Sequence, residues 1–120
     1  MSLRLRMRRA LPEAMRARDK AAVSALRTAL AALDNAEAVS VEGTGPHGSA
    51  LEQSPMGAGA TDVARHELSE HRVVEMVRAE ADERLDAAAQ LTAPAHAHRA
   101  ARLRAEADVL LRFLDGSDTA

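Results

Sequence analysis

The chain has 120 residues, a formal net charge of −2 and no cysteine. This length fits one compact domain, residues 1–120, and leaves little room for a second. The absence of cysteine excludes disulfides and thiolate metal sites. No apolar run is long enough to cross a membrane, and none follows the basic N-terminal residues as it would in a secretory signal. We therefore expect no membrane association and a cytoplasmic location.

Alanine dominates the apolar residues. The chain has 28 Ala, as many as Val, Leu, Met and Phe together, with no Ile and one aromatic residue, Phe113. The scarcity of β-branched residues disfavours sheets, and the abundance of Ala, Leu, Arg and Glu favours helices. We predict an all-α fold of two antiparallel helical hairpins, with four main helices and a long Gly/Pro-rich loop between the pairs.

The first predicted helix covers residues 2–18 and contains Pro12. Its apolar side is formed by Leu3, Met7, Leu11, Ala14 and Met15. Proline removes a backbone donor and crowds the preceding turn, so we expect a kink or a restart at Pro12. On the opposite side, Glu13 is four positions from Arg9, which predicts an ion pair between them.

The second predicted helix covers residues 20–38, with Asp19 as its N-cap. Its apolar stripe consists of Val23, Leu26, Leu30 and Leu33. The short connection to the first helix predicts an antiparallel hairpin. Glu37 points toward the apolar side near the end of this helix, and we interpret it as half of an ion pair with an Arg of another helix rather than as a catalytic carboxylate.

Residues 39–60 contain five of the six glycines and two prolines, without apolar periodicity. We interpret this segment as a flexible loop, in which Leu51 and Met56 could contact the body of the domain. Its glycines are too scattered for a phosphate-binding loop. Thr61 is a candidate cap for a short turn that continues to Leu68.

The third and fourth predicted helices cover residues 69–91 and 96–114. Ser69 is the expected N-cap of the third helix, Pro94 the break, and Gly116 the C-terminal stop. The expected buried residues of these two helices are Val73, Val74, Val77, Ala81, Leu85, Ala88, Leu103, Ala107, Leu110, Leu111 and Leu114.

The charges are unevenly distributed along the chain. Residues 1–27 carry eight Arg or Lys against two acidic residues, whereas the remainder carries eight against sixteen. Arg9, Arg16 and Lys20 form a candidate nucleic-acid surface opposite the apolar side, suited to phosphate contacts that weaken with salt. The alternative is an ordinary solvated face, or docking of this basic end on the acidic helices of the same chain.

No catalytic or metal-binding pattern emerges from the residue spacing. His96 and His98 are two positions apart, and His66 and His71 are five apart, so neither pair shares one helix face as metal ligands would. No serine lies in a nucleophile elbow, and stacking aromatics are absent. We expect no metal, no cofactor and no enzymatic activity; an ordered ligand beside Glu37, Arg27 or Arg78 would revive the enzyme hypothesis.

The N-terminal hairpin resembles the GatB/YqeY family. The family has the pattern Met-Lys-Ala-Arg-Asp-Lys, which resembles Met15 to Lys20 here. It continues with Leu-Ser-x-Leu-Arg, which resembles Val23, Ser24, Leu26 and Arg27. It then has Ala-Ile-x-Asn-x-Glu, which resembles Ala32, Leu33, Asn35 and Glu37. The family-motif positions with polar side chains in this half are Arg18, Asp19, Lys20, Arg27, Asn35 and Glu37.

The resemblance resumes after residue 67. Leu68-Ser69-Glu70 is similar to the family's Leu-Thr-Glu, and Arg78, Glu80 and Arg84 fit its Arg-x-Glu-x-x-x-Arg pattern. Glu106 and Phe113-Leu114 resemble its Glu and Tyr-Leu. The chain departs from the pattern at Pro94-Ala95-His96, which replaces Ala-Gly-Arg. It also ends at Ala120, with Asp115 in place of the family's Pro, so we expect the family's C-terminal helical subdomain to be lacking.

The resemblance implies a module related to the tail of the GatB component of glutamyl-tRNA amidotransferase, the region implicated in holding tRNA. It carries over no catalytic residue, and it implies tRNA or amidotransferase subunits as partners. The leading hypothesis is therefore a non-catalytic helical module that contacts tRNA or assists tRNA amidation. The alternative is a helical protein-interaction module, or one that self-associates as a homo-oligomer because its alanine-rich faces bury little area.

Overall fold

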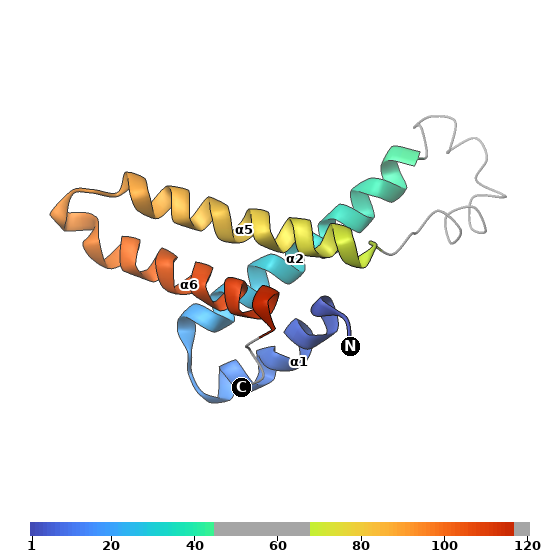
Figure 1. The fold of residues 1–120 in the computed structure, drawn as a ribbon, viewed down its shortest axis with the longest axis horizontal. Coiled ribbons are helices and arrows are strands. Elements are labelled where there is room, and N and C mark those ends of the chain that lie inside the picture. Colours follow the sequence, from blue (N-terminus) through green and yellow to red (C-terminus); the bar gives the residue numbers. More distant parts are fainter. Residues whose placement is uncertain (45–67, 117–120) are drawn as a thin grey trace.

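The computed structural model describes residues 1–44 and 68–116. Within these ranges the chain is helical and forms two antiparallel hairpins (Figure 1). The four α-helices and one short 3₁₀ helix are α1 (Leu3–Arg16), α2 (Lys20–Thr44), α5 (Glu70–Gln90), η1 (Pro94–His96) and α6 (Ala97–Asp115). The predicted all-α fold of paired helical hairpins is confirmed for this part of the chain.

The two hairpins pack across each other. Helices α5 and α6 lie side by side along most of their length, and α2 crosses behind them in Figure 1 while α1 packs below. Each of the four α-helices contacts the other three, so the two hairpins pack into one body.

Helix α1 begins after Ser2, whose hydroxyl accepts the Leu5 N–H at 3.1 Å. It ends at Arg16 rather than at the predicted Arg18. The Asp19 N–H reaches the Ala14 carbonyl at 3.0 Å and the Arg18 N–H reaches the Met15 carbonyl at 3.1 Å. These two bonds form a Schellman motif, in which Arg18 occupies the left-handed position with a φ of 57°.

The predicted caps of the other helices are confirmed. The Asp19 carboxylate accepts the Ala22 N–H at 3.0 Å at the start of α2, and the Ser69 hydroxyl accepts the Arg72 N–H at 3.0 Å at the start of α5. Gly116 ends α6 with a φ of 80°, and its N–H bonds to carbonyls of the last turn. Side chains with short polar oxygens satisfy the free amides at helix starts, and glycine allows the left-handed turn after a helix end.

The core lies where the hairpins cross and is built from all four α-helices. Its fully buried large side chains are Leu3, Met7, Leu26, Leu33, Val77 and Leu110. Small residues lie between the packed helices, and Ala25, Ala29, Ala81 and Ala107 have no exposed surface. The alanine abundance seen in the sequence thus serves close helix packing as well as helix formation.

Several expectations of burial need correction. Val23 is only partly buried, Met15 is 48% exposed and Leu85 is 38% exposed. The buried row of α5 advances by four, four, three and four positions from Val73, which places Arg84 rather than Leu85 on the inner side. A pattern based on apolar residues alone does not include position 84, because the buried residue there is an arginine.

The helix boundaries also differ from prediction. Helix α2 continues to Thr44, so residues 39–44 are helical and do not belong to a loop. Gly43 is the first glycine of this segment, and a single glycine costs a helix only about 1 kcal/mol, so the helix can run to the Gly45-Pro46 pair. The remaining residues of the predicted loop, 45–60, and the turn expected from Thr61 lie outside the described residues.

Helix α1 is one continuous element through Pro12, so the restart, one of the two alternatives expected there, is wrong. Proline removes one backbone donor. The helix continues because its residues pack against the core on both sides of Pro12, through Leu3 and Met7 before it and Ala14 after it. In residues 1–44 and 68–116, no helix is long and apolar enough to span a bilayer.

Candidate nucleic-acid interface

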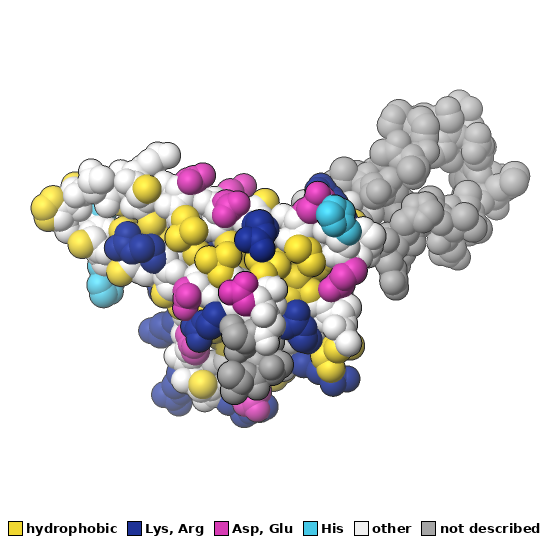
Figure 2. Space-filling model, viewed as in Figure 1, with side chains coloured by type: hydrophobic (Ala, Val, Ile, Leu, Met, Phe, Trp, Pro, Cys, Tyr) yellow, Lys and Arg dark blue, Asp and Glu magenta, His cyan; other side chains and the backbone are white. Residues whose placement is uncertain are grey.

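A hollow lies beside the turn between α1 and α2. It is open to solvent, has a volume of about 560 Å³, and we call it the basic hollow. It is lined by Met15, Arg18, Lys20, Val23, Ser24, Arg27, Thr28 and Arg102. Four of these residues are cationic and none is acidic. In Figure 2 several Lys and Arg side chains likewise gather on the lower part of the molecule, where α1 and the start of α2 lie.

Local helix geometry brings these residues together. Positions 20, 23, 24, 27 and 28 follow the three- and four-residue steps of a single helix face, so the start of α2 forms one wall. The Schellman turn places Arg18 at the end of that wall. Helix α6 supplies Arg102, whose Nη2 donates to the Lys20 carbonyl at a long distance of 3.5 Å.

Two carboxylates, Asp19 and Glu106, adjoin lining residues of the basic hollow but do not line it. Asp19 accepts the Ala22 N–H as the cap of α2. Glu106 pairs with Arg102 at 3.2 Å but also holds the buried Arg84 at 3.0 Å, so it compensates only part of the charge of Arg102. The basic hollow therefore carries an excess of positive charge, which attracts an anion.

The structure separates the three residues of the predicted nucleic-acid surface. Lys20 lines the basic hollow, whereas Arg9 and Arg16 lie on exposed positions of α1 and do not line it. Glu13 pairs with Arg16 at 3.3 Å, so the predicted pairing of Glu13 with Arg9 is wrong. Residues three or four positions apart are neighbours on a helix surface, and Glu13 pairs with the arginine three positions after it.

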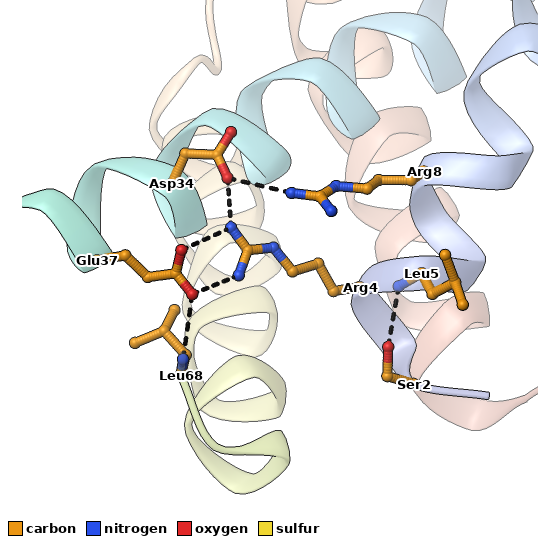
Figure 3. A network of polar contacts seen from close by, with 7 residues as sticks. All are labelled: Ser2, Arg4, Leu5, Arg8, Asp34, Glu37 and Leu68. Carbon is orange, nitrogen blue, oxygen red and sulfur yellow. Dashed lines mark hydrogen bonds and ion pairs between the residues drawn. The ribbon is translucent and has the colours of Figure 1, made fainter. Parts of the chain in front are cut away.

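Glu37 belongs to an ion-pair cluster between α1 and α2 (Figure 3). Its Oε2 accepts a hydrogen bond from Arg4 of α1 at 2.6 Å and another from the Leu68 N–H at 3.1 Å. Arg4 also pairs with Asp34, and Arg8 reaches Asp34 at 3.5 Å. The prediction that Glu37 pairs with an arginine of another helix is confirmed.

These contacts shift the ionisation of both partners. The hydrogen bond from Arg4, supported by the Leu68 N–H and the charges of Arg4 and Arg8, outweighs burial and lowers the pKa of Glu37. The hydrogen bond to Glu37 likewise outweighs burial and raises the pKa of Arg4. An ionised, fully engaged carboxylate is a poor general acid or base, so this cluster is structural.

Residues 68–70 tie the second hairpin to the first. The Leu68 N–H donates to Glu37 of α2, and the Glu70 carboxylate accepts the Leu3 N–H at 3.0 Å at the start of α1. Ser69 between them caps α5. The motif Leu-Ser-Glu thus fixes the start of α5 against both helices of the first hairpin.

A second buried cluster joins α5 to α6. Arg84 bonds Glu80 at 2.9 Å and Glu106 at 3.0 Å, and the side chains of Arg84 and Glu106 are each only 10% exposed. Burial opposes the charged form of Arg84, but hydrogen bonds to Glu80 and Glu106 outweigh it and raise its pKa. Arg78 and Asn35, the remaining motif residues with polar side chains, lie on exposed positions.

Sequence reasoning missed two of the residues that matter here. Arg102 is 82 positions from Lys20, and no local pattern indicates that α6 returns to the start of α2. Arg4 was likewise not identified as the partner of Glu37. Arg27 could have been assigned to the basic surface, because it lies seven positions after Lys20 on one helix face.

Across residues 1–44 and 68–116, no three His, Asp or Glu side chains gather as metal ligands would. His47 and His66 lie outside these ranges. Comparison with known proteins found no matching family model, no matching curated protein and no matching solved structure.

Proposed function

We propose that the chain is a non-catalytic helical module that binds RNA, with tRNA as the expected class, through the basic hollow and the exposed Arg9 of α1. The observation that carries this proposal is an excess of uncompensated positive charge. Arg9, Arg18, Lys20 and Arg27 are exposed, and none forms an ion pair with a carboxylate among the residues that the structure describes.

The distribution of the other charges supports this reading. Elsewhere in the described helices, arginines such as Arg4 and Arg84 are held by two carboxylates each. The chain therefore contains enough acidic residues to neutralise a basic surface, yet none lines the basic hollow. Phosphate oxygens are suitable partners for several cations that lie together without carboxylates.

The resemblance to the GatB/YqeY family supports tRNA as the class of RNA, and it makes amidotransferase subunits a second expected partner. Most polar motif residues fall into two groups in this fold, and Asp19, Asn35 and Arg78 belong to neither. Glu37, Arg84 and Glu106 join helices, with Glu80 supporting Arg84 within α5, whereas Arg18, Lys20 and Arg27 line the basic hollow. The second group is the part of the motif available to a ligand.

A titration of the protein with tRNA at several salt concentrations tests the proposal. We expect affinity to fall steeply with salt, and replacement of Lys20 or Arg27 by Ala to weaken binding and reduce the salt slope by about one phosphate contact. Arg104→Ala is the matched control, since Arg104 lies two positions after Arg102 and therefore on nearly the opposite side of α6. Affinity no higher than that of an unrelated protein of equal charge would refute the proposal.

A second candidate is self-association through α5. Leu85 is 38% exposed on this helix, and Leu5 on α1 is 40% exposed. Ultracentrifugation over a wide range of protein concentrations tests this alternative. A mass that rises with concentration and falls back in Leu85→Gln would support it, whereas a monomer at every concentration would exclude it.

A further inference from the structure

The basic hollow combines an anion-binding wall with an apolar surface, and we infer that it binds one nucleotide of a single-stranded RNA segment or RNA end. This inference deepens the proposed function, because it assigns the RNA contact to a single unpaired nucleotide rather than to the backbone of a duplex. The volume of about 560 Å³ is sufficient for a ligand of nucleotide size, which would stay partly exposed because the hollow is open to solvent.

The cations account for the phosphate. Arg18 and Lys20 flank the start of α2, Arg27 lies two helical turns along the same face, and Arg102 comes from α6. The side chain of Arg102 is 47% exposed, and its Nε is held by Glu106. A phosphate in the basic hollow would therefore be bound mainly by the three residues of the first hairpin.

The apolar part of the hollow accounts for the base. Met15 is 48% exposed although it is a large apolar residue, and Val23 lies on the adjoining wall. The Arg27 guanidinium contacts the Met15 sulfur at 3.9 Å, so a planar cation and a polarisable side chain lie together. Unpaired bases stack on arginine planes as well as on aromatic rings, so this surface can hold a base without an aromatic residue.

The backbone at Arg18 is the independent observation. Left-handed φ values are unfavourable for residues other than glycine, and a Schellman turn normally has glycine at this position. Gly116, which ends α6 in the same conformation, shows the ordinary solution within this chain. A cationic side chain is present at Arg18 despite its strained backbone, and such strain occurs most often at functional sites.

The test compares four ligands: a nucleoside 5′-monophosphate, inorganic phosphate, a single-stranded RNA oligonucleotide and a blunt RNA duplex of equal length. We expect the single strand to bind more tightly than the duplex, and the mononucleotide to bind and to compete with it. Inorganic phosphate should bind more weakly than the mononucleotide. Each of Arg18→Ala and Arg27→Ala should weaken mononucleotide binding about tenfold, with Arg104→Ala unchanged.

Arg27→Lys separates the two roles of Arg27. This variant keeps the charge but loses the planar group, so it should retain phosphate binding and lose the preference for the mononucleotide. Circular dichroism is the check that each variant is folded. Equal affinities of the mononucleotide for the wild-type protein and for folded Arg18→Ala and Arg27→Ala would overturn the inference.

The outcomes also separate this inference from the proposed function. RNA binding that depends on Arg27, without binding or competition by the mononucleotide, would overturn the inference and leave RNA binding in place. Mononucleotide binding that depends on Arg18 and Arg27, without any RNA binding, would overturn the proposed function and the RNA part of this inference, and would leave the hollow as a site for a free nucleotide.

Discussion

Arg84 of α5 donates from its Nε to Glu106 of α6 at 3.0 Å, and both side chains are nearly buried. This pair lies between the two helices of the second hairpin. Arg84 also pairs with Glu80, and Glu106 also pairs with Arg102, so each partner has a second ion pair.

Removal of one partner should therefore cost much more than removal of both. We expect Glu106→Leu to lower the free energy of unfolding by about 2 to 4 kcal/mol, because it leaves Arg84 buried with one carboxylate fewer. The double variant Arg84→Met/Glu106→Leu should recover much of this loss, since no unpaired charge remains. Urea unfolding of the wild-type protein, Arg84→Met, Glu106→Leu and the double variant measures the coupling energy between the two residues. Additive effects of the two single changes would contradict it.

The Arg4–Glu37 pair gives a second prediction. Arg4→Met should lower the free energy of unfolding by about 1 to 3 kcal/mol, because Glu37 loses its main hydrogen-bond partner in a partly buried position. Arg8→Ala is the control. Its contact with Asp34 is 3.5 Å long between exposed side chains, so its removal should change stability by less than about 0.5 kcal/mol.

The lowered pKa of Glu37 predicts how stability depends on pH. The unfolded chain binds a proton at Glu37 more readily than the folded chain does, so stability rises with pH through this range. The contribution is complete above the ordinary Glu value of about 4.3 and is lost as the pH falls through the lower folded value. Urea unfolding at several pH values between neutral and acidic should show a shallower slope in Glu37→Gln than in the wild-type protein. Parallel curves would contradict the assignment.

Arg18 predicts opposite effects on stability and on binding. Arg18→Gly should raise the free energy of unfolding by about 1 kcal/mol, because glycine adopts the left-handed conformation without steric cost. The same change should weaken RNA binding, because a cation is lost from the basic hollow. Arg18→Ala keeps the strain and loses the cation, so it should reduce binding without the gain in stability. A loss of stability in Arg18→Gly would show that the side chain, rather than the backbone, dominates at this turn.

The sequence predicted the helices well because helix formation here is encoded locally. The caps at Asp19 and Ser69 and the stop at Gly116 are single-residue signals that act within one turn. The sequence predicts the end of α2 too early, because residues 39–44 were assigned to the glycine-rich loop although they are helical.

The basic hollow was only partly predictable. Arg18, Lys20 and Arg27 lie in one short segment, and their proximity follows from a turn and a helix face. Arg102 depends on how the second hairpin crosses the first, which no local pattern determines. The burial of Arg84 was missed for a related reason, since its carboxylate partner Glu106 lies on another helix.

The core that the two hairpins share determines how the domain unfolds. Leu26, Leu30 and Leu33 of α2 belong to one buried cluster with Val77 and Leu110 of the second hairpin, so neither hairpin retains a complete core when the other is lost. We therefore expect unfolding in a single cooperative step, with the same midpoint by every spectroscopic probe. A fragment containing only residues 68–116 would expose Val77 and Leu110 and should not hold a fixed tertiary structure.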